Sequence, residues 1–229
     1  MLKLIRLEWK KNRVGTYIRN AAIMTVILSL MLTAMAGELE TAETVEAYGT
    51  DMINASVDLF MNMAYIIFTG VMLASFIVGA YEKRTMHLMF SYPINRKKIL
   101  LSKMAAVWVF NVAAMVISKV FTFGMMLLAR PFLGISAAGI AFGALSFWLD
   151  MLLGSAAMVS ISYIALPVGL LMKSSKATIV TAVVITFLTQ GNIGSATLAN
   201  NMAFYGVLLV IAAWAVFLSL HRVEVRDLP

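Results

Sequence analysis

The sequence predicts an all-α integral membrane protein with six transmembrane helices. Of its 229 residues, 62% are hydrophobic and 13% are charged, whereas soluble domains carry about 25% charged residues. Six apolar segments are separated by polar stretches, and a helical span needs about 20 such residues. The segments are Val14–Ala36, Leu59–Tyr81, Met104–Leu128, Gly139–Leu166, Ala177–Leu198 and Met202–Leu220. We therefore expect a single transmembrane domain over residues 1–229.

Composition also excludes several functional classes. The chain has no cysteine, so disulfides and thiol chemistry are excluded. His87 and His221 are the only histidines, and we expect no metal site. The net charge of +7 lies in the segments beside the apolar stretches, so we expect membrane lipid as a partner and no nucleic acid.

Residues 1–13 are predicted to form an interfacial helix. Leu2, Ile5 and Trp9 fall on one stripe of such a helix, and a basic stripe lies beside it. A helix with an apolar stripe that carries Trp, next to a basic stripe, lies flat at the lipid headgroups. The alternative is a simple basic flank that sets the topology of the first span.

Charge divides the polar segments into two kinds. Lys and Arg gather before the first apolar segment, between the second and third, between the fourth and fifth, and at the C-terminus. The segment after Ala36 has six acidic residues and no Lys or Arg: Glu38, Glu40, Glu43, Glu46, Asp51 and Asp58. Because basic loops stay on the cytoplasmic side, we expect a multi-pass protein of a bacterial plasma membrane with both termini in the cytoplasm.

The basic loop between the second and third spans, residues 82–103, is the most informative segment. It contains six Lys or Arg residues. Pro93 disfavours helix at Tyr92, so the loop is expected to divide into two short pieces. The result is a positively charged, structured surface below the membrane that suits docking to another protein.

The fifth apolar segment is unusual. Its continuous apolar part, Ala177–Leu188, has 12 residues, or about 18 Å of helix, against a hydrocarbon core of roughly 30 Å. Non-helical backbone at membrane depth occurs only where protein or water covers it. We predict a span that ends near Gln190, followed by a short outer re-entrant hairpin over 189–201. The alternative is one continuous span whose Gln190 and Asn192 face other helices.

Two ionisable residues lie within the predicted spans. Lys119 lies 11 residues before Arg130, and Asp150 lies 14 residues after Ser136. At 1.5 Å per residue, both are about 16–21 Å below the outer boundary. A charge at this depth needs a partner or water, and the two spans are joined by a short loop. We predict a Lys119–Asp150 ion pair, which either locks the two spans together or forms a polar point on a transport path or a proton-coupled gate.

The motifs of several enzyme classes are missing. The chain has no G-x-x-x-x-G-K-[ST] phosphate loop, no H-E-x-x-H zinc motif and no G-x-S-x-G nucleophile elbow. We expect no enzymatic activity on this chain alone, so energy for uphill movement would come from a partner or an ion gradient.

The loop over 82–103 resembles that of the membrane subunit of a type 2 ABC exporter. In that family the loop has an acidic residue, a Thr, a Leu-rich turn, a Ser-x-Pro, an Arg and a Lys. The matching residues are Glu82, Thr85, Leu88 with Met89, Ser91, Pro93, Arg96 and Lys103. Arg84 stands where the family often has Gly. Six spans, the interfacial helix, the Leu171–Lys176 loop and the polar break after Leu188 also resemble the family plan.

The resemblance implies an assembly and a mechanism. Two permease copies would pair, as a homodimer or a paralogous heterodimer, and an ABC ATPase that binds ATP and Mg would dock on each. A cytoplasmic coupling helix in the loop would contact the ATPases, as would residues 2–13. The coupling residues implied are Glu82, Lys83, Arg84, Thr85, Leu88, Ser91, Pro93 and Arg96. Closure of the ATPases would move the first, second and fifth spans, and the hairpin with Gln190 and Asn192 would act as the outer gate.

The resemblance also suggests the substrate. Small stand-alone permeases of this kind resemble exporters of antimicrobial or toxic peptides and of antibiotics. We expect an amphipathic peptide, with a drug-like molecule or a lipid as alternatives. Two other classes compete: an ion-gradient-driven carrier that uses Lys119 and Asp150, and a non-transport scaffold or sensor. Carriers usually show paired repeats, and the sequence shows none.

Overall fold

The structure is a computed structural model. It describes Trp9 and residues 14–39, 52–82, 96–133, 142–193, 196–197 and 202–225. Among these residues, five helices are long and apolar enough to cross a membrane. They are Val14–Gly37, Met52–Glu82, Ile99–Phe132, Leu145–Met172 and Phe204–His221. The fifth of the six predicted spans corresponds to a shorter apolar helix, Ser175–Gln190, so six spans are not confirmed.

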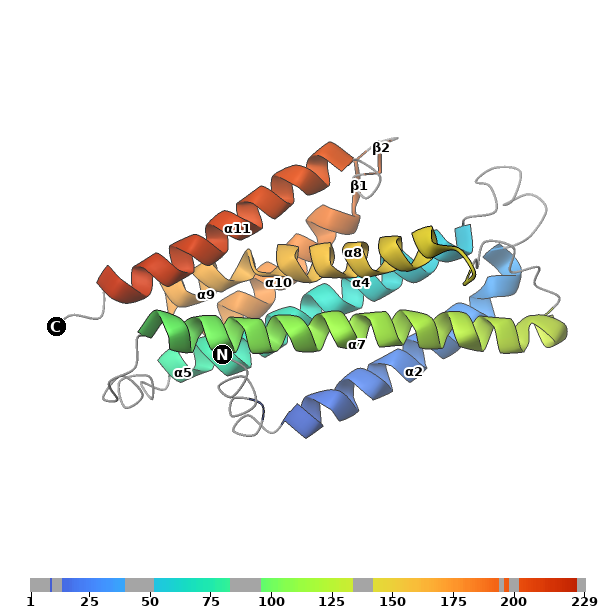
Figure 1. Cartoon of the computed structure of the whole chain (residues 1–229), viewed down its shortest axis with the longest axis horizontal. Helices are drawn as coiled ribbons and strands as arrows, with labels where there is room; N and C mark the ends of the chain where they lie inside the picture. Colours follow the sequence, from blue (N-terminus) through green and yellow to red (C-terminus); the bar gives the residue numbers. More distant parts are fainter. Residues whose placement is uncertain are drawn as a thin grey trace. The chain divides into compact units, whose positions relative to one another are not determined.

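The elements follow the order of the predicted segments (Figure 1). The helices are α2 (Val14–Leu39), α4 (Met52–Leu73), η1 (Ala74–Val78), α5 (Gly79–Glu82), α7 (Arg96–Leu133), α8 (Leu145–Ser162), α9 (Ala165–Met172), α10 (Ser175–Gln190) and α11 (Met202–Val225). Two short strands, β1 (Asn192–Ile193) and β2 (Ala196–Thr197), pair antiparallel between α10 and α11.

The chain divides into two compact units, which are described separately. Unit 1 contains residues 1–14, 63–111 and 156–229, and unit 2 contains residues 15–62 and 112–155. The division falls within α4, α7 and α8, so each of these helices contributes residues to both units.

Unit 1 is built around α10, which packs against α9 and η1, while α11 packs against α9. Two glycines allow this close approach. A Cβ atom at Gly70 would overlap the Cβ of Ala182 on α10, and one at Gly169 would overlap the Thr178 hydroxyl. Small residues at such contacts are the usual means of close helix packing in membranes.

The chain leaves regular helix at two places before α10 begins, between α8 and α9 and between α9 and α10. Pro167 has no amide hydrogen and its ring disfavours helix around the residue four positions before it, and α8 ends at Ser162 just upstream. After α9 the chain turns at Lys173, whose φ of 48° is left-handed, and the amide of Ser174 donates to the Gly169 carbonyl at 3.2 Å. The Ser174 side chain then caps α10 by accepting from the Ala177 amide.

In unit 2, α2 has its polar side inward. Thr25, Ser29 and Thr33 are buried and recur every four residues, whereas Ile27 and Leu30 are exposed. The Thr25 hydroxyl lies 2.5 Å from that of Ser118 on α7. This pattern inverts that of a soluble helix and is expected where the outer face contacts lipid.

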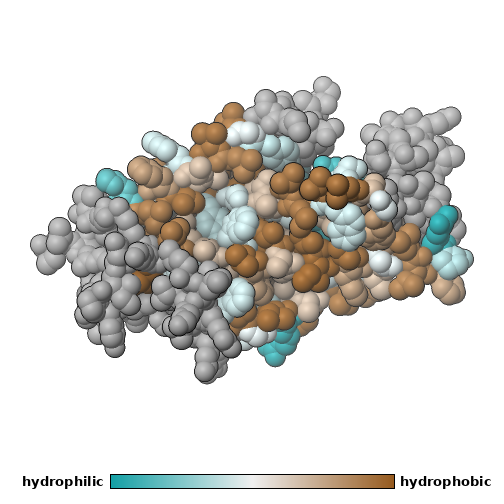
Figure 2. Space-filling model, in the orientation of Figure 1, coloured by the Kyte–Doolittle hydropathy of each residue, from teal (hydrophilic) through white to brown (hydrophobic). Residues whose placement is uncertain are grey.

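The surface is correspondingly apolar. On the face drawn in Figure 2, brown, hydrophobic residues cover much of the described surface, and teal, hydrophilic residues are confined to small areas. Large side chains such as Phe132 (88% exposed) and Trp214 (66%) extend outward. Exposed apolar area on this scale indicates a membrane or protein contact.

Candidate functional site

Most of the predicted coupling loop lies outside the described residues. This applies to Lys83, Arg84, Thr85, Leu88, Ser91 and Pro93. Arg96 is the first residue of α7, so residues 96–103 are the first turns of this helix, and the Arg96 side chain is outside the described part. The two ends of the loop, Glu82 and Lys103, are described, and they define the site below.

Glu82 is the last residue of α5, and its carboxylate contacts the start of α10. Its Oε2 accepts hydrogen bonds from the Ser175 hydroxyl at 2.6 Å and from the Ser175 amide at 3.2 Å. The amides in the first turn of a helix have no partner within the helix, and a negative charge there is favoured by the helix dipole. Glu82 therefore holds the first turn of α10.

The π-helix η1 lies just before Glu82. The Ser175 hydroxyl is also 3.4 Å from the Ala74 carbonyl oxygen in η1. From α7, Lys103 Nζ donates to the Phe76 carbonyl of η1 at 3.2 Å. We call this set of residues the η1 junction: Ala74, Phe76, Glu82, Lys103 and Ser175. It joins the end of the second apolar helix to the starts of α7 and α10, all within unit 1.

Lys103 corrects the sequence prediction. As part of a basic docking surface Lys103 should be exposed, but it is only 1% exposed. The reason is its position: it lies within α7, where its side chain reaches an η1 carbonyl instead of the solvent. A buried ammonium needs hydrogen-bonding partners, and a π-helical segment, which often marks functional sites, supplies one here.

The described part of the N-terminal segment is Trp9; Leu2 and Ile5 lie outside it. Trp9 is helical and half-buried, and its indole Nε1 donates to the Ala106 carbonyl on α7 at 3.2 Å. The side chain predicted to lie at the headgroups thus also contacts α7. Whether residues 1–13 form an interfacial helix stays a prediction.

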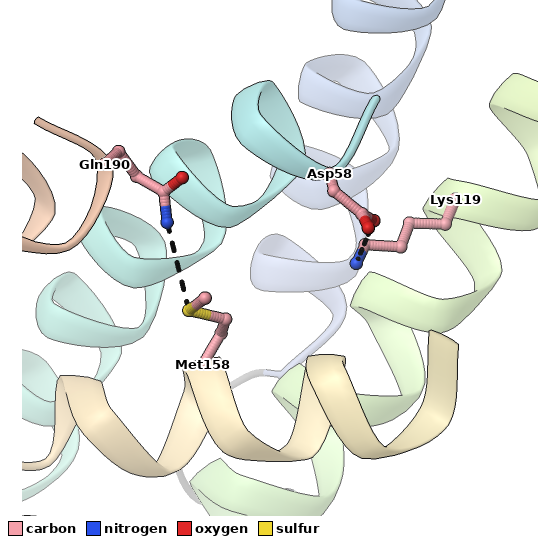
Figure 3. A network of polar contacts seen from close by, with 4 residues as sticks. All are labelled: Asp58, Lys119, Met158 and Gln190. Atoms are coloured by element: carbon pink, nitrogen blue, oxygen red, sulfur yellow. Dashed lines mark hydrogen bonds and ion pairs between the residues drawn. The ribbon is translucent and has the colours of Figure 1, made fainter. Parts of the chain in front are cut away.

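The predicted Lys119–Asp150 pair is wrong. In unit 2, Lys119 Nζ contacts Asp58 Oδ1 on α4 at 2.7 Å (Figure 3). The Lys119 side chain is 3% exposed and that of Asp58 is 55% exposed. Asp150 is exposed and pairs with no other described residue. Asp58 was assigned to the outer loop, but α4 begins at Met52 and places it on a helix beside α7.

The predicted outer gate is described in part. α10 ends at Gln190, and a Gln190 amide nitrogen lies 4.0 Å from the Met158 sulfur within unit 1 (Figure 3). Asn192 pairs with Thr197 in the β1–β2 hairpin, and its side chain is outside the described part. The helix therefore ends where the sequence predicts, and a hairpin follows. Re-entry of this hairpin into the membrane stays a prediction.

The sequence patterns considered above did not identify Ser175 or Asp58 as site residues. Ser174 followed by an apolar run was a visible helix-start signal, which would have placed Ser175 in a first turn. Among the described residues, no three His, Cys, Asp or Glu side chains gather into a possible metal site.

The chain is similar in sequence to known proteins. Residues 4–189 match the sequence model of a family described as ABC-2 family transporter protein. Over 103 residues the chain is 31% identical to YcbO, an uncharacterized protein of Bacillus subtilis (strain 168), and the match covers 45% of each chain. This relative is therefore matched over less than half its length. No solved structure matches the chain.

Proposed function

The chain belongs to the ABC-2 family of transporter proteins, and from this premise we propose that it exports an amphipathic substrate while a separate subunit hydrolyses ATP. Members of this family are multi-pass membrane components of ABC transporters and work with ATPase subunits. The observation that carries the proposal is the match over residues 4–189, which includes the basic loop and the η1 junction at its ends.

We assign energy coupling to this loop. ATPases are expected to dock on residues 83–96, with residues 2–13 as a second contact. The loop leaves α5 at Glu82 and enters α7 at Arg96, so force on it acts on two long apolar helices at once. ATP and Mg would be bound by the partner, since the chain lacks a phosphate loop.

The proposed assembly has two permease copies and two ATPases. The copies are identical or paralogous, and the path runs between them. The distribution of Lys and Arg supports cytoplasmic termini and a plasma membrane location. With α10 as the short fifth span of about 24 Å, the chain crosses the membrane six times, and Gln190 with the β1–β2 hairpin forms the outer gate.

An amphipathic peptide is the proposed substrate, with a drug-like molecule or a lipid as alternatives. Support comes from the resemblance to small peptide and antibiotic exporters. The ion-gradient carrier required Lys119 and Asp150 to act together. Because Lys119 pairs with Asp58 instead, we do not propose that function.

Co-purification tests the proposal. The full chain is isolated in nanodiscs with candidate ATPases from its own cells, and ATP hydrolysis is compared for wild type, Glu82→Ala and Arg96→Ala. We expect a stable complex whose hydrolysis falls in the variants. Lys176→Ala, an exposed basic residue on α10, controls for loss of charge. If no ATPase binds the folded wild-type chain, the proposed ATP-driven export by this chain is wrong.

A further inference from the structure

We propose that Ser175 is a positioning residue that transmits movement of the coupling loop to α10, through its hydrogen bonds to Glu82. The inference rests on the proposed function, because it concerns how ATP-driven movement reaches the path. It assigns a role to Ser175, and it gives Glu82 an internal role besides contact with an ATPase.

The contact has the right geometry for transmission. Glu82 is the last helical residue before the loop and Ser175 is the first residue of α10. The hydroxyl and the amide of Ser175 both donate to one carboxylate oxygen, at 2.6 Å and 3.2 Å. Two bonds from one residue to a charged acceptor are directional and stronger than neutral ones, so displacement of Glu82 pulls on the first turn of α10.

The π-helix sets the direction of Glu82. A π-helical segment holds one residue more than the α-helical path it replaces, and each residue turns an α-helix by about 100°. Without η1, Glu82 would therefore point about 100° away from its observed direction. Lys103 Nζ donates to the Phe76 carbonyl of η1. The Ser175 hydroxyl, whose single hydrogen is donated to Glu82, lies 3.4 Å from the Ala74 carbonyl oxygen of η1. These contacts place the π-helix between α7 and α10.

The remaining contacts of α10 allow it to move as a unit. Its threonine hydroxyls donate to carbonyls of the same chain segment: Thr178 to Ser174, Thr181 to Ala177, Thr186 to Ala182 and Thr189 to Ile185. Among the described residues, the side-chain hydrogen bonds from α10 to other elements therefore lie at its ends, Ser175 and Gln190. Force applied at Ser175 is opposed along the helix by packing, not by hydrogen bonds.

The first test needs no ATPase. Amide hydrogen exchange in the first turn of α10 is measured in the full chain in nanodiscs. We expect Glu82→Ala to accelerate exchange there by roughly two- to tenfold, as loss of one or two hydrogen bonds predicts. Unchanged exchange in Glu82→Ala would overturn the inference while leaving the proposed function intact.

The second test uses the complex with its ATPase. Because the chain has no native cysteine, an environment-sensitive fluorophore on Lys176→Cys reports on the first turn of α10. In Ser175→Ala we expect ATP hydrolysis within about twofold of wild type, with most of the ATP-dependent fluorescence change lost. Ser175→Thr should restore the change, since it restores the hydroxyl. Thr181→Ala, which removes a hydroxyl bonded only within α10, should retain it.

The outcomes separate the two proposals. If Ser175→Ala keeps the full fluorescence change while Glu82→Ala loses it, Glu82 acts only at the ATPase contact and the inference is wrong. If no ATPase binds the wild-type chain, the proposed function fails and the inference fails with it.

Discussion

Replacing Gly70 by Ala should weaken the packing of α4 on α10. A Cβ atom at Gly70 would overlap the Cβ of Ala182, and it would lie 3.8 Å from the Ala182 Cα and 3.9 Å from the Thr178 carbonyl oxygen. The Ala182 methyl has no rotamer to adopt, so the two helices must separate. Overpacking of this kind costs about 1–3 kcal/mol.

The expected shift in stability is the sum of two opposing effects. An Ala within a helix is favoured over Gly by about 1 kcal/mol, so Gly70→Ala should lower the free energy of unfolding by a net of about 0–2 kcal/mol. Gly124 on α7 is the matched control, because a Cβ there meets nothing within 4 Å. Gly124→Ala should gain the helical preference alone, which puts the two variants about 1–3 kcal/mol apart.

Thermal unfolding in detergent measures this difference. For a chain of this size, 1 kcal/mol corresponds to about 2–4 °C in Tm, so Gly70→Ala should melt about 2–12 °C below Gly124→Ala. Adding Ala182→Gly to Gly70→Ala moves the methyl from α10 to α4 and should recover part of the loss. Equal Tm values for the two single variants would refute the close contact between α4 and α10.

Three further predictions concern single side chains, each checked by Tm in the same assay. Asp58→Asn leaves the buried Lys119 ammonium without its partner and should melt below Lys119→Met, which removes the buried charge. Asp150→Asn should melt like wild type. A Tm of Asp150→Asn below that of Asp58→Asn would contradict the Lys119–Asp58 pairing. Lys103→Met keeps much of the packing but removes a charged donor from the Phe76 carbonyl, so it should lose about 1–3 kcal/mol; a wild-type Tm would argue against that bond. Lys173→Gly relieves a left-handed residue and should gain about 1 kcal/mol, whereas a loss would show that the lysine side chain is needed at this turn.

The helices were predictable because their signals are local. Apolar segments of sufficient length identified each long helix, and Gln190 marks the end of α10 as the polar sequence after Leu188 predicted. The start of α4 at Met52 was missed, because Asp51 and Asp58 gave that stretch the composition of a loop. A single carboxylate can lie on a transmembrane helix when a cation from a neighbouring helix pairs with it, as Lys119 does.

The pairing of side chains was not predictable, because it depends on residues that are far apart in the sequence and not on local signals. Lys119 and Asp150 were matched by depth along adjacent segments, but depth does not reveal which faces of two helices meet. The contact between Glu82 and Ser175 joins residues 93 apart in sequence, and η1 sets its direction. The residue types in η1 do not predict a π-helix, so the direction of the Glu82 side chain could be learned only from the structure.

The junction changes the interpretation of the conspicuous charges in the basic loop. Residues that contact an ATPase need to be exposed, whereas residues that transmit its movement need firm contacts inside the permease. Lys103 is buried against η1 and Glu82 is bonded to α10, so both meet the second requirement. The exposed contacts are then expected within 83–96, between these two anchors. A substitution in that range should weaken ATPase binding, whereas a substitution at Ser175 should leave binding intact and uncouple hydrolysis from the movement of α10. Both quantities, the affinity for the ATPase and the ATP-dependent movement of α10, can be measured in one complex. A variant that lowers the affinity identifies a docking residue, and a variant that lowers only the movement identifies a transmitting residue.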